Sequence, residues 1–176
     1  MAENECVPYK RKPLYLALTI PMIVLYIAIA LLLWRINVAF FAVYISLFVL
    51  VALFMSYVCV HWQCPYVGKF APCVGGFCLP SSQIARLFKK AKRSETRYNV
   101  FLTLAYASFF GIIFFPMYFL YTQGILYLLG YIGIVTIYGV AFTLLICPVC
   151  GTRHVCPGGQ AAVKMREAID SRRANS

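Results

Sequence analysis

The chain has 176 residues, of which 62% are hydrophobic and 12% are charged, and its formal net charge is +11. Soluble domains are typically about a quarter charged and no more than about half apolar. The composition therefore excludes a soluble globular domain, a disordered tail and a collagen-like rod, and it predicts an integral membrane protein.

Four uncharged apolar runs follow one another along the chain, at residues 14–34, 38–58, 100–121 and 125–146. Each is about 20 residues long, and a helix of that length crosses the ~30 Å hydrocarbon core of a bilayer. The runs lack the alternation of apolar and polar residues that marks transmembrane strands. We therefore expect an all-α membrane protein with four transmembrane helices.

Two short connections set the expected topology. Residues 35–37 join the first two runs and residues 122–124 join the last two, so each pair should form an antiparallel hairpin. The N-terminus, the segment 59–99 and the C-terminal tail would then share one side of the membrane. Of the 16 Lys and Arg residues, only Arg35 falls on the other side. The positive-inside rule makes the basic side cytoplasmic, with both termini there and the chain in the plasma or inner membrane.

The apolar runs also limit the chemistry of the bundle. They contain no Asp, Glu, Lys, Arg or His, the residues that mark ion pathways, proton relays and bis-histidine haem sites in membranes. Gly111, Gly130, Gly133 and Gly139 are expected to let helices approach closely. The positive charge belongs to the loops, which directs it toward anionic membrane lipid rather than nucleic acid.

Cysteines gather just after the second and the fourth apolar run. Of the eight cysteines, only Cys6 lies elsewhere. The first cluster contains Cys59, Cys64, Cys73 and Cys78, and the second contains Cys147, Cys150 and Cys156. A cytoplasmic location disfavours structural disulfides, and packing as small apolar side chains explains a lone thiol better than two clusters. The pattern therefore indicates metal ligation.

The two halves of the chain look like copies. PSSQIARLFKKA, from Pro80, aligns with PGGQAAVKMREA, from Pro157, and each segment follows a cysteine cluster. We therefore predict two repeats, each consisting of a hairpin, a cysteine loop and a basic helix. The first repeat is 1–98, with its loop at 59–78 and its basic helix at 81–98; the second is 99–176, with its loop at 147–156 and its basic helix at 159–173. An apolar stripe on each basic helix would place it in the headgroup layer, with its cations toward anionic lipid.

Each half offers four metal ligands. In the first half these are its four cysteines, and in the second they are its three cysteines and His154, which is favoured over His61 because its half is one thiol short. Zinc is bound by four Cys or by three Cys and one His, and Cys147-Pro-Val-Cys150 is typical of zinc ribbons and rubredoxin. An iron–sulfur cluster takes four thiolates, and a Cys followed by Pro, as at Cys156, closes many ferredoxin motifs. The residues alone leave both metals open.

The order of elements resembles that of a known membrane family. V-G-G-F-Cys78-Leu-Pro-Ser-Ser-Gln-Ile-Ala and H-V-Cys156-Pro-Gly-Gly-Gln-Ala-Ala look like a repeated Cys-x-x-x-Cys-Pro motif and its following helix. That motif belongs to four-helix membrane subunits of the quinol-dehydrogenase type, which are linked to ferredoxin domains and associated with periplasmic nitrate reductase and nitrous-oxide reductase. Here Leu79 is inserted and the cysteines are more widely spaced. The resemblance implies [4Fe–4S] clusters, electron transport and a quinone partner.

Two functions fit these residues. The first is a membrane subunit whose cytoplasmic iron–sulfur centres transfer electrons between a quinone and a partner subunit of a larger complex. The alternative is a scaffold or assembly subunit in which zinc staples the two loops to the bundle. A reactive Cys147–Cys150 pair is disfavoured by its position after a helix C-terminus. No catalytic residue is predicted, because only five acidic residues are present and none is near a histidine in sequence. Whether the chain is itself an enzyme stays open.

Overall fold

The computed structural model describes residues 12–62, 64, 66–67, 78–88, 94–150, 153–154 and 156–174. All secondary structure in this part of the chain is helical. The elements in chain order are α1 (Lys12–Ile36), α2 (Val38–His61), α3 (Cys78–Phe88), α4 (Glu95–Gln123), α5 (Ile125–Leu145), a 3₁₀ turn (Cys147–Val149) and α6 (Pro157–Ala174). The all-α prediction is confirmed for these residues.

Four of these helices, α1, α2, α4 and α5, are long and apolar enough to cross a membrane, and they coincide with the four apolar runs. This is consistent with an integral membrane protein. α1, α2 and α4 extend a few residues beyond their runs, so that α2 includes Cys59 and ends at His61, whereas α5 ends at Leu145, one residue before the end of its run. Residues 95–98, assigned above to a basic helix, form the first turn of α4, because Ser94 is extended (φ −142°, ψ 126°) and α4 begins after it.

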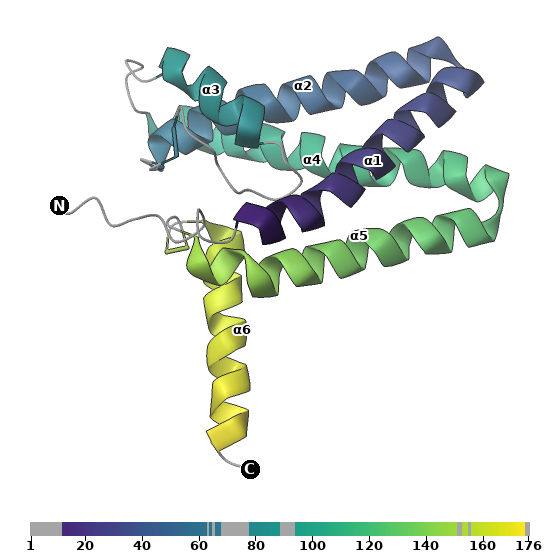
Figure 1. Cartoon of the computed structure of the whole chain (residues 1–176). Coiled ribbons are helices and arrows are strands. Elements are labelled where there is room, and N and C mark those ends of the chain that lie inside the picture. Colours follow the sequence, from purple (N-terminus) through teal and green to yellow (C-terminus); the bar gives the residue numbers. More distant parts are fainter. Residues whose placement is uncertain are drawn as a thin grey trace.

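One residue, Asn37, joins α1 to α2, and one residue, Gly124, joins α4 to α5. The Asn37 side chain accepts a hydrogen bond from the Ala39 N–H at 2.8 Å and so caps α2. Gly124 links α4 to α5 with φ +141°, a conformation that L side chains rarely adopt. Figure 1 shows the long helices running along one another, with both links at the same end. We call that end the turn end, and the opposite end, where the described cysteines lie, the cysteine end.

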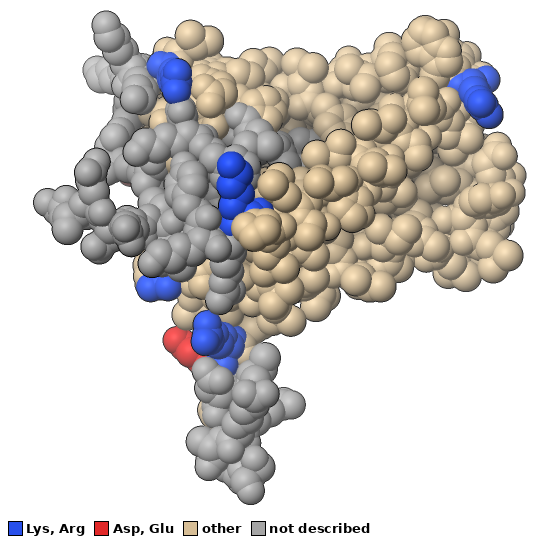
Figure 2. All heavy atoms as spheres, in the orientation of Figure 1, with Lys and Arg blue, Asp and Glu red and all other residues tan. Residues whose placement is uncertain are grey.

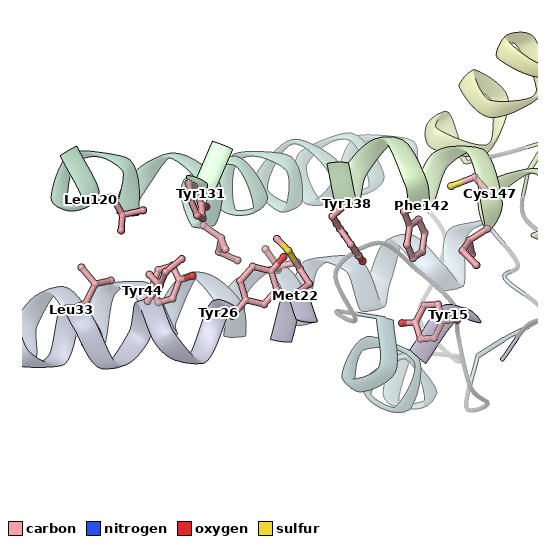
Figure 3. Close-up of a cluster of buried hydrophobic side chains, with 14 of the residues drawn as sticks. Tyr15, Met22, Tyr26, Leu33, Tyr44, Leu120, Tyr131, Tyr138, Phe142 and Cys147 are labelled. Atoms are coloured by element: carbon pink, nitrogen blue, oxygen red, sulfur yellow. The ribbon is translucent and has the colours of Figure 1, made fainter. Parts of the chain in front are cut away.

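Buried side chains fill the bundle along its length (Figure 3). Tyr15, Phe142 and Cys147 lie toward the cysteine end of this core, and Leu33 and Leu120 lie toward the turn end. The Tyr15 and Phe142 rings meet edge to face with centroids 6.0 Å apart, an arrangement that aromatic pairs prefer. The core is therefore continuous from the region of Cys147 to the turns.

The bundle is closed along one seam and open along another. α2 packs extensively on α4, where ring centroids are 4.7 Å apart for Phe40 and Phe119 and 4.8 Å apart for Tyr57 and Phe101. α1 and α5 touch far less. A cavity of about 540 Å³ lies between them toward the turn end.

The glycines expected to bring helices together do so at one position. A Cβ on Gly111 would lie 3.3 Å from Leu47 of α2, which is a close approach. A Cβ on Gly130, Gly133 or Gly139 would meet nothing within 4 Å in the described part of the chain. The three glycines of α5 therefore lie on open parts of its surface, because α5 has few neighbours.

The two short helices leave the bundle differently. α3 lies against the cysteine end of α2, where the Tyr57 and Phe88 ring centroids are 6.2 Å apart. α6 runs away from the bundle, across the direction of the long helices (Figure 1). Figure 2 shows the described Lys and Arg side chains gathered mainly toward the cysteine end. Arg35, in the last turn of α1, is at the turn end.

Candidate metal centre

Cys59 and Cys64 lie at the cysteine end of α2. Cys59 belongs to the helix rather than to the loop expected to begin there, and its exposed fraction is 4%. The helix ends at His61, and the Cys64 N–H then donates to the Cys59 carbonyl oxygen at 3.0 Å. This turn brings the two cysteine backbones together, with both side chains buried.

α3 covers these two cysteines. Ala85, with an exposed fraction of 0%, packs in one buried cluster with Cys59, Cys64 and Tyr66. The small Ala85 side chain lets α3 approach closely. Leu87, which belongs to the apolar stripe predicted from the sequence, is 81% exposed. The packed face of α3 therefore contains Ala85 and Phe88 and leaves Leu87 exposed.

Cys147 and Cys150 belong to different clusters, although they share one 3₁₀ turn. The Cys150 N–H donates to the Cys147 carbonyl oxygen at 3.2 Å. Cys147 belongs to the core of the bundle, whereas Cys150 packs against the buried cluster of Cys59 and Cys64. A cysteine from the second half thus packs against the buried cluster that contains two cysteines of the first half. We call Cys59, Cys64 and Cys150 the cysteine cluster.

Arg153 organises the rest of the second loop. Its Nε donates to His154 Nε2 at 3.0 Å, and its Nη1 donates to the Pro148 carbonyl oxygen at 3.0 Å. The first turn of α6 presses on the same residue, since a Cβ on Gly159 would lie 2.7 Å from the Arg153 carbonyl oxygen and nearer still to its Cα. The Gln160 side chain donates to the His154 carbonyl oxygen at 2.8 Å. His154 is exposed, and its Nε2 is engaged by Arg153 in this arrangement.

His61, the other histidine near a cysteine, has a different environment. Its ring stacks on Tyr98, with centroids 4.1 Å apart and planes 16° apart. The Tyr98 hydroxyl in turn accepts a hydrogen bond from Trp62 Nε1 at 3.0 Å, which fixes the ring that orients His61. The His61 Nδ1 atom is buried and has no hydrogen-bond partner in the described part of the chain. Because a buried polar atom without a partner is costly and imidazole nitrogen is a common metal ligand, His61 suits ligation better than His154 does.

The donors suit a metal, although no coordination sphere is formed by the described side chains. Thiolate and imidazole are the ligands that zinc and iron prefer. Among the described residues no three His, Cys, Asp or Glu side chains could together hold an ion. Cys73 lies outside the described residues, and so does the side chain of Cys78, the first residue of α3. The described cysteine side chains are thiols at Cys59, Cys64, Cys147, Cys150 and Cys156.

The structure therefore divides the predicted ligands. Cys59 and Cys64 share one buried cluster, Cys150 packs against that cluster, and Cys147 belongs to the core of the bundle. Cys156 immediately precedes α6, and its carbonyl oxygen accepts a hydrogen bond from the Gln160 N–H at 3.0 Å. Sequence reasoning missed the roles of Arg153 and Tyr98. The only sequence signals for them are an arginine between Cys150 and His154 and a tyrosine at the start of an apolar run.

No protein family, curated protein or solved structure matches this chain.

Proposed function

We propose that the chain is a membrane subunit of a larger complex, which holds cysteine-ligated metal on the cytoplasmic side and passes electrons between a quinone and a partner protein. The observation that supports this proposal is the cysteine cluster: Cys150, from the other half of the chain, packs against the buried cluster that contains Cys59 and Cys64. Thiols from two distant loops at one end of an apolar bundle are typical of metal sites in a reducing compartment.

In this proposal the chain consists of two pseudo-repeated hairpins, each followed by a cysteine loop and a basic helix, as in the quinol-dehydrogenase-type subunits that it resembles. The four long apolar helices support a membrane location. The gathering of Lys and Arg at the cysteine end supports a cytoplasmic orientation of that end. Anionic lipid would be the partner of these basic side chains.

Cys59, Cys64 and Cys150 would contribute thiolates to the metal, and the remaining ligands would come from Cys73, Cys78 and Cys156, with His61 as a further donor. An iron–sulfur cluster bound there would accept and release single electrons. The residues of the chain shield the site: Ala85 brings α3 over the thiols, and Tyr66 packs beside them. Tyr98 holds the plane of the His61 ring, which favours one direction for its Nδ1 lone pair. Burial of this kind tunes a metal centre by keeping water away.

The absorption spectrum and metal content of the full chain, purified without oxygen, test this function. We expect a brown protein that contains iron and labile sulfide. Cys73→Ser, Cys78→Ser, Cys150→Ser and Cys156→Ser should each lower bound metal and steady-state protein, because binding energy at such a site is also folding energy. Cys6→Ser is the matched control and should change neither. Unchanged metal content in all four variants would mean that these cysteines pack as small apolar side chains and do not bind metal.

The orientation is tested by labelling intact cells with a membrane-impermeant thiol reagent. Cysteines introduced as Asn37→Cys and Ser176→Cys should behave oppositely, with the first labelled and the second protected. The unsubstituted chain measures the background from its own thiols. Labelling at residue 176 but not at residue 37 would reverse the topology.

A second candidate is a scaffold stapled by zinc. The cysteine cluster favours it as well, because it lies where α2, α3 and the second loop meet, so a metal there would tie the two halves together. Structural zinc contributes about 10–16 kcal/mol of apparent binding free energy in small peptides, which is ample to order such loops. A colourless protein containing zinc and no iron would select this function.

A further inference from the structure

The cavity between α1 and α5 is distant from the cysteine cluster and plays no part in the proposed function. Its volume is about 540 Å³, within the roughly 300–1,000 Å³ of small-molecule sites. From α1 it is lined by Leu25, Ala28 and Leu32, and from α5 by Leu126, Gly130 and Ile134. It therefore lies in the half of the bundle nearer the turn end.

The cavity exists because two helices meet at one end only. Tyr15 of α1 and Phe142 of α5 pack edge to face toward the cysteine end. Farther along, the small residues Ala28 and Gly130 contribute to the walls, and a Cβ on Gly130 would meet nothing within 4 Å in the described part of the chain. In the seam between α2 and α4, large rings such as Phe40 and Phe119 fill the corresponding space. The cavity therefore results from the small side chains of α1 and α5 at this level of the bundle.

The cavity is apolar inside and polar at one end. Tyr131 contributes to the wall, but its hydroxyl already donates to the Ile113 carbonyl oxygen at 3.0 Å, so it makes no demand for a polar ligand. Gln123 lines the cavity at the last residue of α4, at the turn end. Arg35 is exposed and follows Leu32 by three residues, so it lies one turn farther along the same face of α1. A molecule that fits this cavity has an apolar tail inside and an anionic group at the turn end.

We propose that one acyl chain of a phospholipid occupies the cavity and that Arg35 binds its phosphate, with the Gln123 amide beside it. A guanidinium group suits this role because it binds phosphate through two parallel hydrogen bonds. The tail fills a space whose walls would otherwise lack contacts on one side, which restores dispersion attraction between α1 and α5. The lipid is in this way a component of the bundle that bridges its open seam.

Native mass spectrometry of the full chain tests the proposal, after release from bilayers of phosphatidylglycerol and phosphatidylethanolamine. The unchanged chain should retain one phospholipid. Gly130→Leu fills the cavity from α5 and should lower the retained fraction at least tenfold, and Ala28→Phe should do the same from α1. Gly139→Leu is the matched control, because its Cβ also meets nothing within 4 Å and it does not line the cavity.

Arg35→Gln separates the phosphate contact from the cavity. It should leave the cavity open and lower retention several-fold, with phosphatidylglycerol affected more than phosphatidylethanolamine. Helix content by circular dichroism identifies any variant that has lost its fold, and the two filling variants act from different helices. Equal retention in both filling variants and in Gly139→Leu would overturn the proposal. So would an unchanged chain that retains no lipid, or one that retains a quinone instead.

Discussion

The two cysteine loops begin alike and end in different surroundings. After α2 the chain turns back at Cys64, and α3 then lies on α2 so that Ala85 seals the buried cysteines. After α5 the chain makes a 3₁₀ turn, and α6 then runs away from the bundle (Figure 1). The helices that follow the two loops have similar sequences, and each buries one alanine, Ala85 in α3 and Ala162 in α6. However, α3 lies along α2, whereas α6 contacts the bundle near its start and then runs away from it.

The length of the chain before each helix accounts for the difference. The segment from Cys64 to α3 is more than twice as long as the segment from Cys150 to α6, so the first leaves room for its helix to lie along α2. By contrast, α6 contacts the bundle near its start, where Ala162 is buried in the core. In the shorter loop Gly159 is pressed against Arg153, and this contact sets the direction in which α6 leaves. A repeated motif therefore fixes helix formation, while the preceding loop decides what the helix covers.

The largest effect should come from placing a charge under the covering helix. Ala85→Glu buries a carboxylate without a partner, which should lower the free energy of unfolding by more than about 3 kcal/mol or detach α3. Thermal unfolding in lipid nanodiscs and trypsin cleavage within α3 measure the two outcomes. Ala161→Glu, at an exposed position of α6, is the control and should stay within about 0.5 kcal/mol. Equal effects would mean that Ala85 is not sealed between α3 and the buried cysteines.

The contact that directs α6 should be nearly as sensitive. Gly159→Ala places a Cβ against the Arg153 backbone, which should cost about 1–3 kcal/mol of stability and increase trypsin cleavage at Lys164. Gly158→Ala is the matched control one residue earlier, where a Cβ would lie 3.9 Å from Cys156 Sγ, an ordinary contact. Identical melting curves for the two variants would remove the close approach as the cause of the direction of α6.

The two histidines should differ in their effect on bound metal. His61→Gln removes the buried Nδ1 donor and should lower metal retention against a chelator at least about tenfold, equivalent to about 1.4 kcal/mol. His154→Gln changes an exposed ring held by Arg153 and should have less effect. Metal analysis after timed chelator treatment distinguishes them. A greater loss from His154→Gln would support the ligand set expected from the sequence, which includes His154.

The smallest effect should come from the exposed side of α3. Leu87→Ser should change the free energy of unfolding by no more than about 0.5 kcal/mol, since this side chain is 81% exposed. Phe88→Ser, next to it, removes a ring that packs on Tyr57 and should cost more. Unfolding of both variants in the same nanodiscs makes the comparison. A larger loss at Leu87 would mean that the apolar stripe read from the sequence faces a partner.

The sequence was sufficient for the long helices and insufficient for the contacts between loops. Uninterrupted apolar runs and their polar links predicted α1, α2, α4 and α5 because span length and hydropathy are local properties. The apolar run predicts a helix that ends at Val58, whereas α2 includes Cys59 and ends at His61. The packing of Cys150 against the buried cluster of Cys59 and Cys64 joins segments far apart in the chain, which no local pattern encodes.

The same limit explains the glycines and histidines. Gly130 and Gly111 look equivalent in the sequence, but only Gly111 has a neighbouring helix close enough to need a small residue. His154 was favoured over His61 by counting thiols in each half, whereas the environment of each ring depends on Tyr98 and Arg153 from the tertiary structure. Counting the ligands in each half of the chain also assumes that each half forms a complete metal site on its own.

The single-residue links at Asn37 and Gly124 bear on how the chain enters a bilayer during synthesis. If the helices insert as adjacent pairs, the polar matter that must be carried across the membrane is limited to the short tips at the turn end. Those tips contain one charged residue, Arg35, and a few amide and hydroxyl groups. Moving these tips across the membrane costs less free energy than moving the basic segments at the cysteine end. The preference for keeping Lys and Arg on the cytoplasmic side would then orient each helix pair in one direction. In the orientation proposed above, the parts of this bundle that cross the membrane during insertion are its tightest turns.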